Sequence, residues 1–392
     1  MKILRVISSM NPTQGGPSQG IRNSIPEMSK LGIKNEVVCF DKGDEDYCGQ
    51  DHFNIFYLGP SKGPYSYCPN LSSWLKNNLT NYDVVIIHGL WLYNSYGTYK
   101  VWHKMKDKGV LVPRLYIMPH GMLDPYFQAA PDRKIKAIRN SIFWHLFERK
   151  TVNGVDGILF TCKRELELAK QTFTGYSPKK EINVTYGIQH PPQYKGDMKD
   201  AFLQKSGLKK DEPFLLFLSR IHPKKGVDLL IKAYRKIKKK GYIANIPKLV
   251  IAGPLNSKFN QDLASSVQGR EDIIFTGMLQ GDAKWGAMYL CEAFILPSHQ
   301  ENFGIAVAEA LACGKPVLIT EMVNIYKEIV DADAGLVYED NQDGIENMLL
   351  DWFSTSQIER SNMNVNAAKV YRDKFSIDNS VKETVNQLRG LS

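Results

Sequence analysis

The stretch LPSHQENFGIAVAEALACG, residues 296–314, gives the strongest indication of the fold. The apolar run AFIL, which ends just before Pro297, reads as a short buried strand, and the apolar segment after Gly304 reads as a helix. Two glutamates, Glu301 and Glu309, lie on either side of the sequence NFG. A strand, a turn and a helix in this order are typical of a βαβ unit, and Glu301 follows directly where the strand ends.

The same alternation extends over the chain of 392 residues. Apolar runs separated by amphipathic patterns predict parallel strands joined by helices. A polar segment near residues 190–210 divides them into two series, and the chain is too long for one ordinary core. We therefore predict an α/β fold with two doubly wound domains. The runs are ILRVI, EVVCF, DVVIIHG, RLYIMPH and DGILFT, and then FLLFLS, KLVIAG, DIIFTG, AFILPS and PVLIT.

Composition narrows the class of protein and its partners. The net charge of +9 favours anionic partners, such as nucleotide phosphates, nucleic acid or an anionic membrane surface, without choosing among them. The six cysteines form no CxxC pair, which predicts buried free thiols of a cytosolic protein rather than disulfides or metal ligands. The apolar core of the N-terminus is too short for a signal peptide, and no run is long enough to span a bilayer. We expect a cytoplasmic protein.

Ligands of doubly wound sheets bind beyond the carboxyl ends of the strands. Two such sheets facing each other across a cleft would bring these edges together. Glycines, histidines and charged residues follow several of the predicted strands. They are Gly15, Gly16, His88 and His120 in the first half, and Arg220, Gly277 and Glu301 in the second.

Two loops suit phosphate groups. In SRIHPKKGVDLL, residues 219–230, Arg220 and Lys225 offer a forked guanidinium and an ammonium for two adjacent phosphates. Such cations can carry the charge of a leaving nucleoside diphosphate without a metal ion. In TQGGPSQG, residues 13–20, adjacent glycines before a helix allow close approach of a phosphate or sugar. The alternatives are a basic surface loop and a plain tight turn. The second loop is not GxGxxG, so it does not imply a nicotinamide cofactor.

The opening stretch suits the remainder of a nucleotide sugar. Free N–H groups from Phe303 to Ala306, at the helix start, could hold a diphosphate. Glu301 could accept hydrogen bonds from sugar hydroxyls, and Glu309 could bind a ribose diol. The alternative for Glu309 is an exposed helix acid, but its neighbours are apolar, so the carboxylate needs a partner.

These motifs together resemble family 4 retaining glycosyltransferases, which have the GT-B fold and an E-x7-E motif. The resemblance covers nearly the whole chain in order: GG, R-x4-K-G, AG at residues 252–253, FTG at 275–277, NFG, and ACGKPV at 312–317. It implies two Rossmann-like domains facing across a cleft. Residues 1–195 would form the acceptor domain, completed by C-terminal helices crossing back at 373–392, and residues 196–372 the nucleotide-sugar domain.

The resemblance also implies the site. The donor would be a UDP-sugar, bound without metal or other cofactor, and the departing phosphate oxygen would take the proton of the acceptor. The catalytic set would be His120, Arg220, Lys225 and Glu301. The remaining donor-binding set would be Gly15, Gly16, Gly253, Met278, Leu279, Asn302, Phe303, Gly304, Ile305, Ala306 and Glu309.

Acceptor contacts are predicted at three residues of the first domain. His88, together with Trp91 and Tyr93, offers an aromatic wall for a sugar, and Asp124 could assist. The alternative for Asp124 is that it caps a turn before Pro125, and the alternative for the donor-facing His120 is that it is structural, as a lone histidine more often is.

The basic segment 132–150 carries Phe143, Trp144 and Phe147 near its cations, which is typical of a helix on an anionic membrane. This predicts peripheral contact at the inner face of the cytoplasmic membrane. The alternative is that its apolar face packs on the sheet. For the second basic segment, 232–240, we expect a solvated surface.

We therefore predict a retaining, metal-independent hexosyltransferase of polysaccharide biosynthesis in the cell envelope. Its acceptor would be a glycan or a lipid-linked saccharide, and UDP-glucose is the favoured donor by prevalence, with a GDP-sugar still open. Two triplets, residues 44–46 and 331–333, match a metal-binding DxD pattern but lie away from the other motifs, so we interpret them as solvated acids. The alternatives are a sugar-nucleotide epimerase on the same fold and a catalytically silent nucleotide-binding partner of another transferase.

Overall fold

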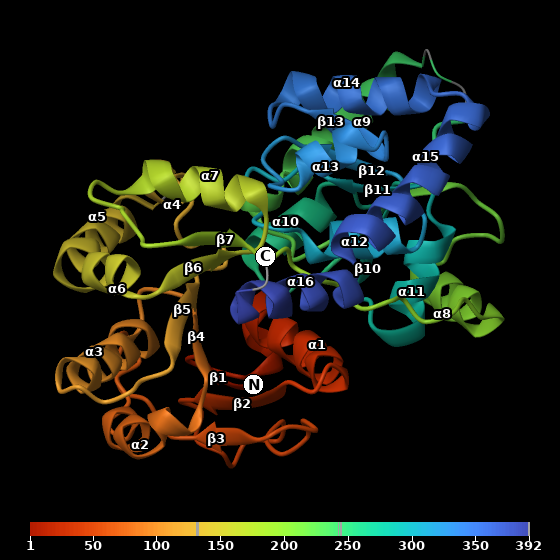
Figure 1. Cartoon of the computed structure of the whole chain (residues 1–392). Coiled ribbons are helices and arrows are strands. Elements are labelled where there is room, and N and C mark those ends of the chain that lie inside the picture. Colours follow the sequence, from red (N-terminus) through yellow and green to blue (C-terminus); the bar gives the residue numbers. More distant parts are fainter. Residues whose placement is uncertain (131–132, 242, 244, 391–392) are drawn as a thin grey trace. The chain divides into compact units, whose positions relative to one another are not determined.

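The computed structural model describes residues 1–130, 133–241, 243 and 245–390 (Figure 1). The chain divides into two compact units, each described here by itself. The N-terminal unit comprises Met1–Gly187 and Ile377–Ser392, and the C-terminal unit comprises Ile188–Ser376. The sequence analysis places the two boundaries between these units after residues 195 and 372. The first residue of the basic segment 132–150 and the last two of the C-terminal segment 373–392 lie outside the described residues.

The N-terminal unit is built on a seven-stranded sheet in the order β3-β2-β1-β4-β5-β6-β7, and all its strand pairs are parallel. Its elements are β1 (Lys2–Val6), η1 (Pro12–Gln14), α1 (Gly16–Lys30), β2 (Lys34–Cys39), β3 (Ile55–Tyr57), α2 (Leu71–Asn78), η2 (Leu79–Asn81), β4 (Val84–His88), α3 (Tyr93–Asp107), β5 (Arg114–Met118), α4 (Tyr126–Ala129), α5 (Lys134–Phe143), η4 (Trp144–Glu148), α6 (Arg149–Gly154), β6 (Gly157–Phe160), α7 (Lys163–Thr172), β7 (Glu181–Asn183) and α16 (Ile377–Arg389).

Side chains of this sheet alternate between two buried faces, because successive residues of a strand point to opposite sides. Leu4 and Val6 lie in a core with residues of α2, α3 and α6. Ile3 lies on the opposite face, in a core with residues of α1 and α16. Figure 1 shows α16, in dark blue, along α1, in red. The position of Arg5, between Leu4 and Val6, puts it on the face covered by α1 and α16.

The packing of α16 explains why the chain returns to the N-terminal unit. A Cβ at Gly187 would lie 2.7 Å from the Cα of Ile377 and 2.7 Å from the Cβ of Ser380, so only glycine lets α16 pack this closely. The Ser380 hydroxyl donates a hydrogen bond to the Thr185 carbonyl oxygen, 2.7 Å away. The amphipathic helix at the C-terminus thus covers apolar surface that α1 leaves open.

The C-terminal unit is built on a six-stranded sheet in the order β10-β9-β8-β11-β12-β13, again with parallel strand pairs. Helices α8 and α11, α9 and α14, and α12 and α15 pack in pairs beside it. Its elements are α8 (Gly196–Ser206), β8 (Phe214–Leu218), η5 (Pro223–Lys225), α9 (Val227–Lys240), β9 (Lys248–Ala252), α10 (Lys258–Ser265), β10 (Ile273–Gly277), α11 (Gly281–Leu290), β11 (Ala293–Leu296), α12 (Ile305–Ala312), β12 (Val317–Thr320), α13 (Tyr326–Asp331), β13 (Gly335–Tyr338), α14 (Gln342–Ser354), α15 (Gln357–Val370) and η6 (Tyr371–Phe375).

Each sheet has one point at which the strand order reverses. In the N-terminal unit it lies between β1 and β4, and in the C-terminal unit between β8 and β11. Loops leaving two such strands in opposite directions open a crevice at the carboxyl edge, where ligands of doubly wound sheets bind. The prediction of two doubly wound, Rossmann-like domains is confirmed. The two switch points are the positions at which a ligand is expected to bind.

Two further sequence predictions concern cysteines and membrane spans. All six cysteines are free, and four of them, Cys39, Cys68, Cys162 and Cys291, are buried. This confirms the prediction of free thiols. Over the described ranges, no helix is both long enough and apolar enough to cross a bilayer.

Candidate functional site

The switch point of the C-terminal unit is built by a close approach of two loops. Gly226, between η5 and α9, has φ 64°, and a Cβ there would lie 2.0 Å from the Pro297 carbonyl oxygen. Only glycine fits, because the backbone is left-handed and the neighbouring loop is in contact. The loop after β8 is therefore fixed against the loop after β11.

This contact brings Lys225 to Glu301. The Lys225 ammonium donates a short hydrogen bond to the Glu301 carboxylate, and the lysine is buried, with 7% of its surface exposed. Arg220, which follows β8, is exposed, and its guanidinium has no hydrogen-bond or ion-pair partner among the described residues. The three residues that the sequence predicts as catalytic in this unit thus lie on the two loops that flank the switch point.

The start of α12 leaves backbone donors open. Its N-cap residue, Gly304, has φ 78° and makes no side-chain cap hydrogen bond. The first N–H groups of a helix carry partial positive charge, so an anion is stabilised there. Phe303 is buried against Phe375, with ring centroids 5.5 Å apart, which anchors the turn that precedes the helix.

Glu309 has a partner that the sequence does not identify. The Lys284 ammonium on α11 lies 2.7 Å from Oε1 of Glu309, and the two side chains are 22% and 14% exposed. A carboxylate on this apolar helix is satisfied by a cation from the neighbouring helix. Among the described residues, its second carboxylate oxygen has no partner, so it can accept from a diol.

The ends of β9 and β10 complete the edge. A Cβ at Gly253 would lie 2.2 Å from the Ser219 carbonyl oxygen, so the glycine allows the loop after β8 to pass beside it. Gly253 donates to the Gly277 carbonyl oxygen over 3.0 Å. Beyond Gly277, Met278 is 60% exposed and Leu279 is 6% exposed. Of these two residues of the predicted donor-binding set, Met278 is thus at the surface of this edge and Leu279 is buried.

A buried hydroxyl network supports the loop after β11. Ser298 is fully buried, and its hydroxyl lies 3.1 and 3.0 Å from the carbonyl oxygens of Lys224 and Gln300, to either of which it can donate its one proton. The His299 N–H donates to the Lys224 carbonyl oxygen at 2.8 Å, and the Thr320 hydroxyl donates to that of Ser298 at 2.5 Å. The sequence offers only a weak signal for this network, namely hydroxyl residues at the ends of two apolar runs.

In the N-terminal unit, the predicted glycine-rich turn is the start of α1. Gly15 has φ 96° and Gly16 is the first residue of the helix. The Tyr186 hydroxyl donates to the Gly16 carbonyl oxygen over 2.7 Å, and its ring occupies the space that a Cβ at Gly20 would need. Tyr186 is thus a supporting residue of this turn that the sequence does not reveal.

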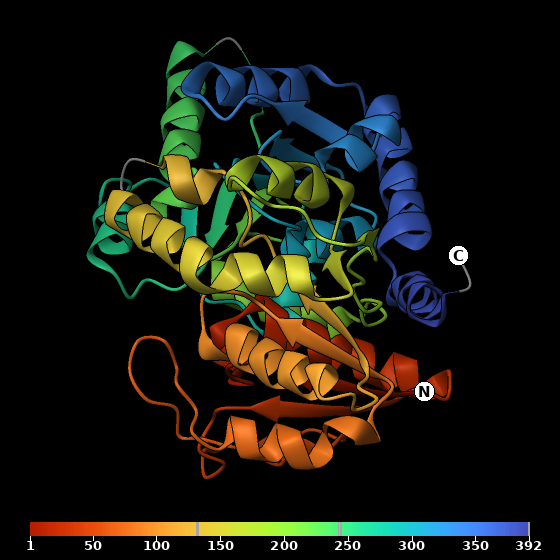
Figure 2. The same cartoon turned by 60° about the vertical axis from the view of Figure 1, so that its left-hand side comes forward.

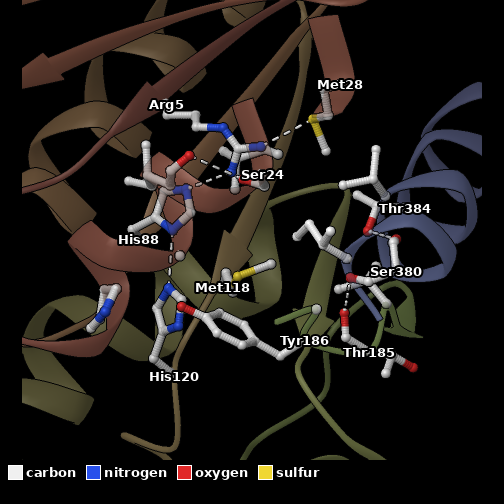
Figure 3. A pocket seen from close by; sticks show the side chains of 18 residues that line it. Arg5, Ser24, Met28, His88, Met118, His120, Thr185, Tyr186, Ser380 and Thr384 are labelled. Atoms are coloured by element: carbon white, nitrogen blue, oxygen red, sulfur yellow. Dashed lines mark hydrogen bonds between the residues drawn. The ribbon is translucent and has the colours of Figure 1, made fainter. Parts of the chain in front are cut away.

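The two histidines of this edge bind each other (Figure 3). Nδ1 of His88 lies 3.0 Å from Nε2 of His120, and Nε2 of His88 lies 3.4 Å from Nη1 of Arg5. Burial lowers the pKa of His88 well below its ordinary value, and the neighbouring His120 and Arg5 lower it further. Burial, followed by the charge of Arg5, lowers the pKa of His120 to about 3. Both rings are neutral at physiological pH.

Two buried glutamates support the loops after β4 and β5. Glu165 on α7 accepts from the Gly121 N–H at 2.5 Å and from the Thr161 N–H at 2.8 Å. Glu148 accepts from the Trp91 N–H at 2.8 Å and from the Ser95 hydroxyl at 2.6 Å. Burial raises the pKa of Glu148 to about 7, although both hydrogen bonds act in the opposite direction. Neither residue belongs to a motif, and the only signal is an acid within a helical segment next to apolar residues.

The three predicted acceptor residues differ in how far they are exposed. His88 is 4% exposed and both ring nitrogens are engaged, and Asp124 is 6% exposed. Burial of this kind argues against direct acceptor contact for either residue. Asp124 accepts from the Tyr126 N–H at 2.9 Å, which is the turn cap considered as its alternative. Trp91, with φ 70°, is half-buried and its acceptor role stays a prediction.

The acidic triplets show no gathering of ligands. Asp44 is exposed and pairs with Lys42 over 2.6 Å, and Asp331 and Asp333 are exposed. Among the residues that the structure describes, no three His, Cys, Asp or Glu side chains are grouped so that they could hold a metal ion.

Comparison with known proteins agrees with the geometry of the C-terminal unit. Residues 198–370 match the glycosyl transferases group 1 family. An uncharacterized glycosyltransferase of Methanocaldococcus jannaschii is 30% identical over 220 residues, which are 54% of this chain and 54% of that protein. The chain spans about half the length of several curated relatives that it matches. The family match contains Arg220, Lys225, Glu301 and Glu309.

Two further relatives extend over more of the chain. The lipopolysaccharide 1,2-N-acetylglucosaminetransferase of Salmonella typhimurium is 22% identical over 359 residues, covering 85% of this chain and 84% of that protein. Anabaena HepE, solved in complex with UDP and glucose, superposes with a TM-score of 0.73 at 16% identity, covering 100% of both chains. The fold is therefore that of GT-B glycosyltransferases, with two Rossmann-like units.

Proposed function

We propose that this protein is a retaining, metal-independent glycosyltransferase that transfers a hexose from a UDP-sugar to a glycan or a lipid-linked acceptor in polysaccharide biosynthesis. The single observation that carries the proposal is the arrangement at the switch point of the C-terminal unit. There, the unpaired guanidinium of Arg220 follows β8, and the Lys225–Glu301 pair joins the loops after β8 and β11. Anion-binding and hydroxyl-binding groups are thus side by side.

In this proposal the diphosphate is bound by cations and by the start of α12. Arg220 binds the phosphate oxygens with its fork of N–H donors, and Lys225 adds a second positive charge. The open N–H groups after Gly304 bind the same anion. As the bond to the sugar breaks, these groups stabilise the negative charge that develops on the leaving phosphate.

Glu301 is proposed to bind the transferred sugar. Its carboxylate already accepts from Lys225, so it suits a hydrogen-bond acceptor for a sugar hydroxyl better than a nucleophile. A departing phosphate oxygen can then take the proton of the acceptor hydroxyl on the same face, which retains the anomeric configuration. Glu309 is proposed to accept from the ribose hydroxyls while Lys284 neutralises part of its charge.

UDP-glucose is the donor that we favour. The support is that Anabaena HepE, with the same fold, was solved with UDP and glucose. In the N-terminal unit we propose that His120 donates a hydrogen bond to a ligand oxygen and that Gly15 and Gly16 approach a phosphate. Envelope polysaccharide is favoured because one relative is a lipopolysaccharide transferase.

The proposal is tested by incubating the protein with UDP-glucose, UDP-galactose or GDP-mannose and detecting the nucleotide released. We expect UDP release from UDP-glucose, slow with water alone and faster with a suitable glycan acceptor, and unaffected by EDTA. The new linkage from an α-linked donor should be α by NMR. Tight UDP binding without transfer or hydrolysis would point to the silent partner, and an interconverted sugar nucleotide would point to the epimerase. A β product would refute the retaining mechanism.

We also propose that the N-terminal unit contacts an anionic membrane surface through α5 and η4. Figure 2 shows α5, η4 and α6 as one helical run in yellow. Four aliphatic side chains on one side of this run are unusually exposed: Ile135 at 85%, Ile138 at 63%, Ile142 at 53% and Leu146 at 56%. Exposed cations flank them at Lys134, Lys136, Arg139 and Lys150. This combination is typical of interfacial helices.

The aromatic residues of this segment do not contribute as predicted. Trp144 is fully buried, and the Phe143 and Phe147 rings pack on Tyr65 at 5.3 and 6.1 Å. The apolar surface available to lipid is therefore aliphatic. One side of this helical run packs inward, while another stays exposed and supports the proposed membrane contact.

Vesicle flotation tests the membrane contact. We expect binding to vesicles that contain phosphatidylglycerol and little binding to phosphatidylcholine alone. The double variant I138E/I142E should lose binding while keeping hydrolysis of UDP-glucose. Ile358→Glu is the matched control, because Ile358 is 76% exposed but belongs to α15 of the C-terminal unit and not to the proposed membrane face. Equal binding of all three proteins would contradict the assignment.

A further inference from the structure

A buried arginine lies behind the histidine pair and has no acidic partner among the residues that the structure describes. Arg5 is in the middle of β1, is 3% exposed, and is surrounded by the sheet, α1 and α16. Its Nε donates to Oδ1 of Asn35 at 3.0 Å, and its Nη2 lies 3.2 Å from Sδ of Met28. Burial lowers the pKa of Arg5 to about 10, so it stays charged at neutral pH. Burying a charge without an opposite charge costs free energy of folding, so we expect Arg5 to have a function that offsets this cost.

The contacts of Arg5 decide where the protons of both histidines lie. A guanidinium can only donate hydrogen bonds. Because Nη1 of Arg5 faces Nε2 of His88 at 3.4 Å, that nitrogen must be the acceptor, and the proton of the neutral ring is on Nδ1. Nδ1 of His88 then donates to Nε2 of His120 over 3.0 Å, and the proton of His120 is on Nδ1 in turn. Figure 3 shows the three side chains in sequence, with Arg5 farthest from His120.

We propose that Arg5 is a positioning residue that acts through His88 to hold His120 as the Nδ1–H tautomer, so that His120 always offers a hydrogen-bond donor to an oxygen of the ligand. The identity of that ligand, a sugar nucleotide, rests on the proposed function. The order of protons in the unliganded protein does not.

The surroundings keep this donor in place. Nδ1 of His120 has no partner among the described residues, and the side chain is only partly buried. The backbone of His120 has φ 53°, an unusual value for a residue other than glycine, and the next N–H, of Gly121, is held by Glu165. Ring and backbone are therefore both fixed, which is what a preorganised donor requires.

The charged and titratable groups around His120 also keep it neutral. Arg5 faces the pair from β1, Tyr186 lies beside the His120 ring from the segment after β7, and Glu165 on α7 is engaged with backbone N–H groups. Partial burial of the ring, and then the positive charge of Arg5, lower the pKa of His120 to about 3. The Nδ1–H donor thus persists through the pH range of growth, without a switch near neutrality.

The test is ¹⁵N NMR of the histidine rings at pH 7 in the unliganded protein, with His88 and His120 identified among the 8 histidines by single His→Asn variants. We expect both rings as Nδ1–H tautomers, although free histidine prefers the proton on Nε2. Neither ring should titrate between pH 5 and 8. An Nε2–H signal for His120 in the wild-type protein overturns the proposal without any variant at Arg5.

Variants then test whether Arg5 is the cause. Arg5→Met should mix the tautomers of His120 and raise its pKa, and should lower kcat by roughly tenfold with a smaller change in KM. Arg5→Lys, which keeps a donor-only cation, should restore part of both. Arg114→Met, at the exposed end of β5, is the control and should change neither. An unchanged His120 spectrum in folded Arg5→Met overturns the role of Arg5.

Addition of UDP-glucose separates the proposal from the proposed function. If His120 donates to this ligand, its Nδ1–H signal should shift and exchange more slowly with water. If both rings are Nδ1–H tautomers but do not respond to UDP-glucose, the positioning role of Arg5 is supported and the ligand assignment is contradicted. A response to UDP-glucose with His120 as the Nε2–H tautomer would do the opposite.

Discussion

The two units have the same topology at their switch points but treat charge in opposite ways. In the N-terminal unit, Glu148 accepts from a backbone N–H and a hydroxyl, and Arg5 is buried without an acid. In the C-terminal unit, Glu301 pairs with Lys225 and Glu309 with Lys284. The first edge buries a cation and a carboxyl apart from any opposite charge among the described residues, whereas the second pairs each carboxylate with a lysine.

This difference teaches how one fold supports two kinds of recognition. A lysine that is paired with a carboxylate can turn to an anionic ligand when one arrives, because the ligand replaces the negative charge that the carboxylate supplied. A buried cation whose neighbours are neutral, such as Arg5, has no such charge to exchange, so it holds those neighbours in one arrangement. The C-terminal edge is suited to a ligand with phosphates, and the N-terminal edge is suited to orienting a neutral donor.

The largest effect is expected at Arg220, a cation of the C-terminal site that has no hydrogen-bond or ion-pair partner among the described residues. Arg220→Ala should lower kcat by about 100- to 1,000-fold, because the charge on the leaving phosphate loses a donor. The variant should stay folded, since Arg220 is exposed. Arg235→Ala on α9, an exposed arginine away from the switch point, is the control for charge. Steady-state kinetics with UDP-glucose measures both, and full activity of Arg220→Ala would contradict the site.

The buried carboxyl of the N-terminal unit should reveal itself in the pH dependence of stability. Burial raises the pKa of Glu148 from its ordinary 4.5 to about 7. Between these values the folded state keeps a proton that the unfolded state releases, so the free energy of unfolding should fall as pH rises, by up to about 3 kcal/mol. Glu148→Gln cannot release a proton, and its advantage over the wild type should grow from pH 5 to pH 8 in urea unfolding.

Glu36 provides the matched control for this measurement. Burial alone would raise its pKa, but hydrogen bonds from Tyr82 and Lys2 outweigh burial and lower it. Glu36 is therefore ionised in both states above pH 5, and Glu36→Gln should show no trend from pH 5 to 8. A flat difference for Glu148→Gln over the same range would show that Glu148 is compensated after all.

A smaller effect is expected from the glycine that brings the two loops of the C-terminal site together. Gly226→Ala should cost about 2 kcal/mol more than Gly241→Ala in the free energy of unfolding, and should lower activity. Both glycines flank α9 with similar φ, 64° and 70°, but a Cβ would meet Pro297 only at Gly226. Chemical denaturation of both variants isolates the cost of the contact. Equal losses would mean that the loop can move away freely.

The smallest effect is expected at the pair that holds Glu309. Lys284→Met should lower the free energy of unfolding by about 1 kcal/mol, because both partners are partly buried. Lys369→Met is the control, since the Lys369–Asp373 pair is 68% and 51% exposed, and its loss should be barely measurable. Thermal denaturation at low and high salt distinguishes the two, and identical results would place both pairs at the surface.

The sequence predicted the two-unit fold, the residues at the strand ends and all strands except the sheet-edge strands β3, β7 and β13. These predictions follow from periodicity and from the rule that parallel strands end at a common edge. It also predicted that Glu309 needs a partner, but not that Lys284 is that partner. Contacts between helices depend on side-chain positions that no local pattern specifies. Lys284 is one of many lysines in helices, and only the packing of α11 against α12 distinguishes it.

The supporting residues of the N-terminal unit were not predicted for a related reason. Arg5 in ILRVI is a visible anomaly, a charge in a strand that should be buried on both faces. Its function depends on His88 and Asn35, which come from other strands. His88 was assigned to an acceptor because it follows a strand, whereas its burial depends on the packing of α1 and α16. Sequence motifs thus indicate the residues that contact a ligand better than they indicate the residues that support them.

The return of α16 to the N-terminal unit has a consequence for synthesis of the protein on the ribosome. Ile3, Met28 and Ile86 belong to the core that α16 covers, yet residues 188–376 are translated before α16 emerges. At bacterial translation speeds this interval is roughly 10 to 40 s. During that time the N-terminal unit has an uncovered apolar face while the C-terminal unit can already close its own core. The N-terminal unit is therefore synthesised first but completed last. A nascent chain stalled before Ile377 should bind chaperones through its N-terminal unit.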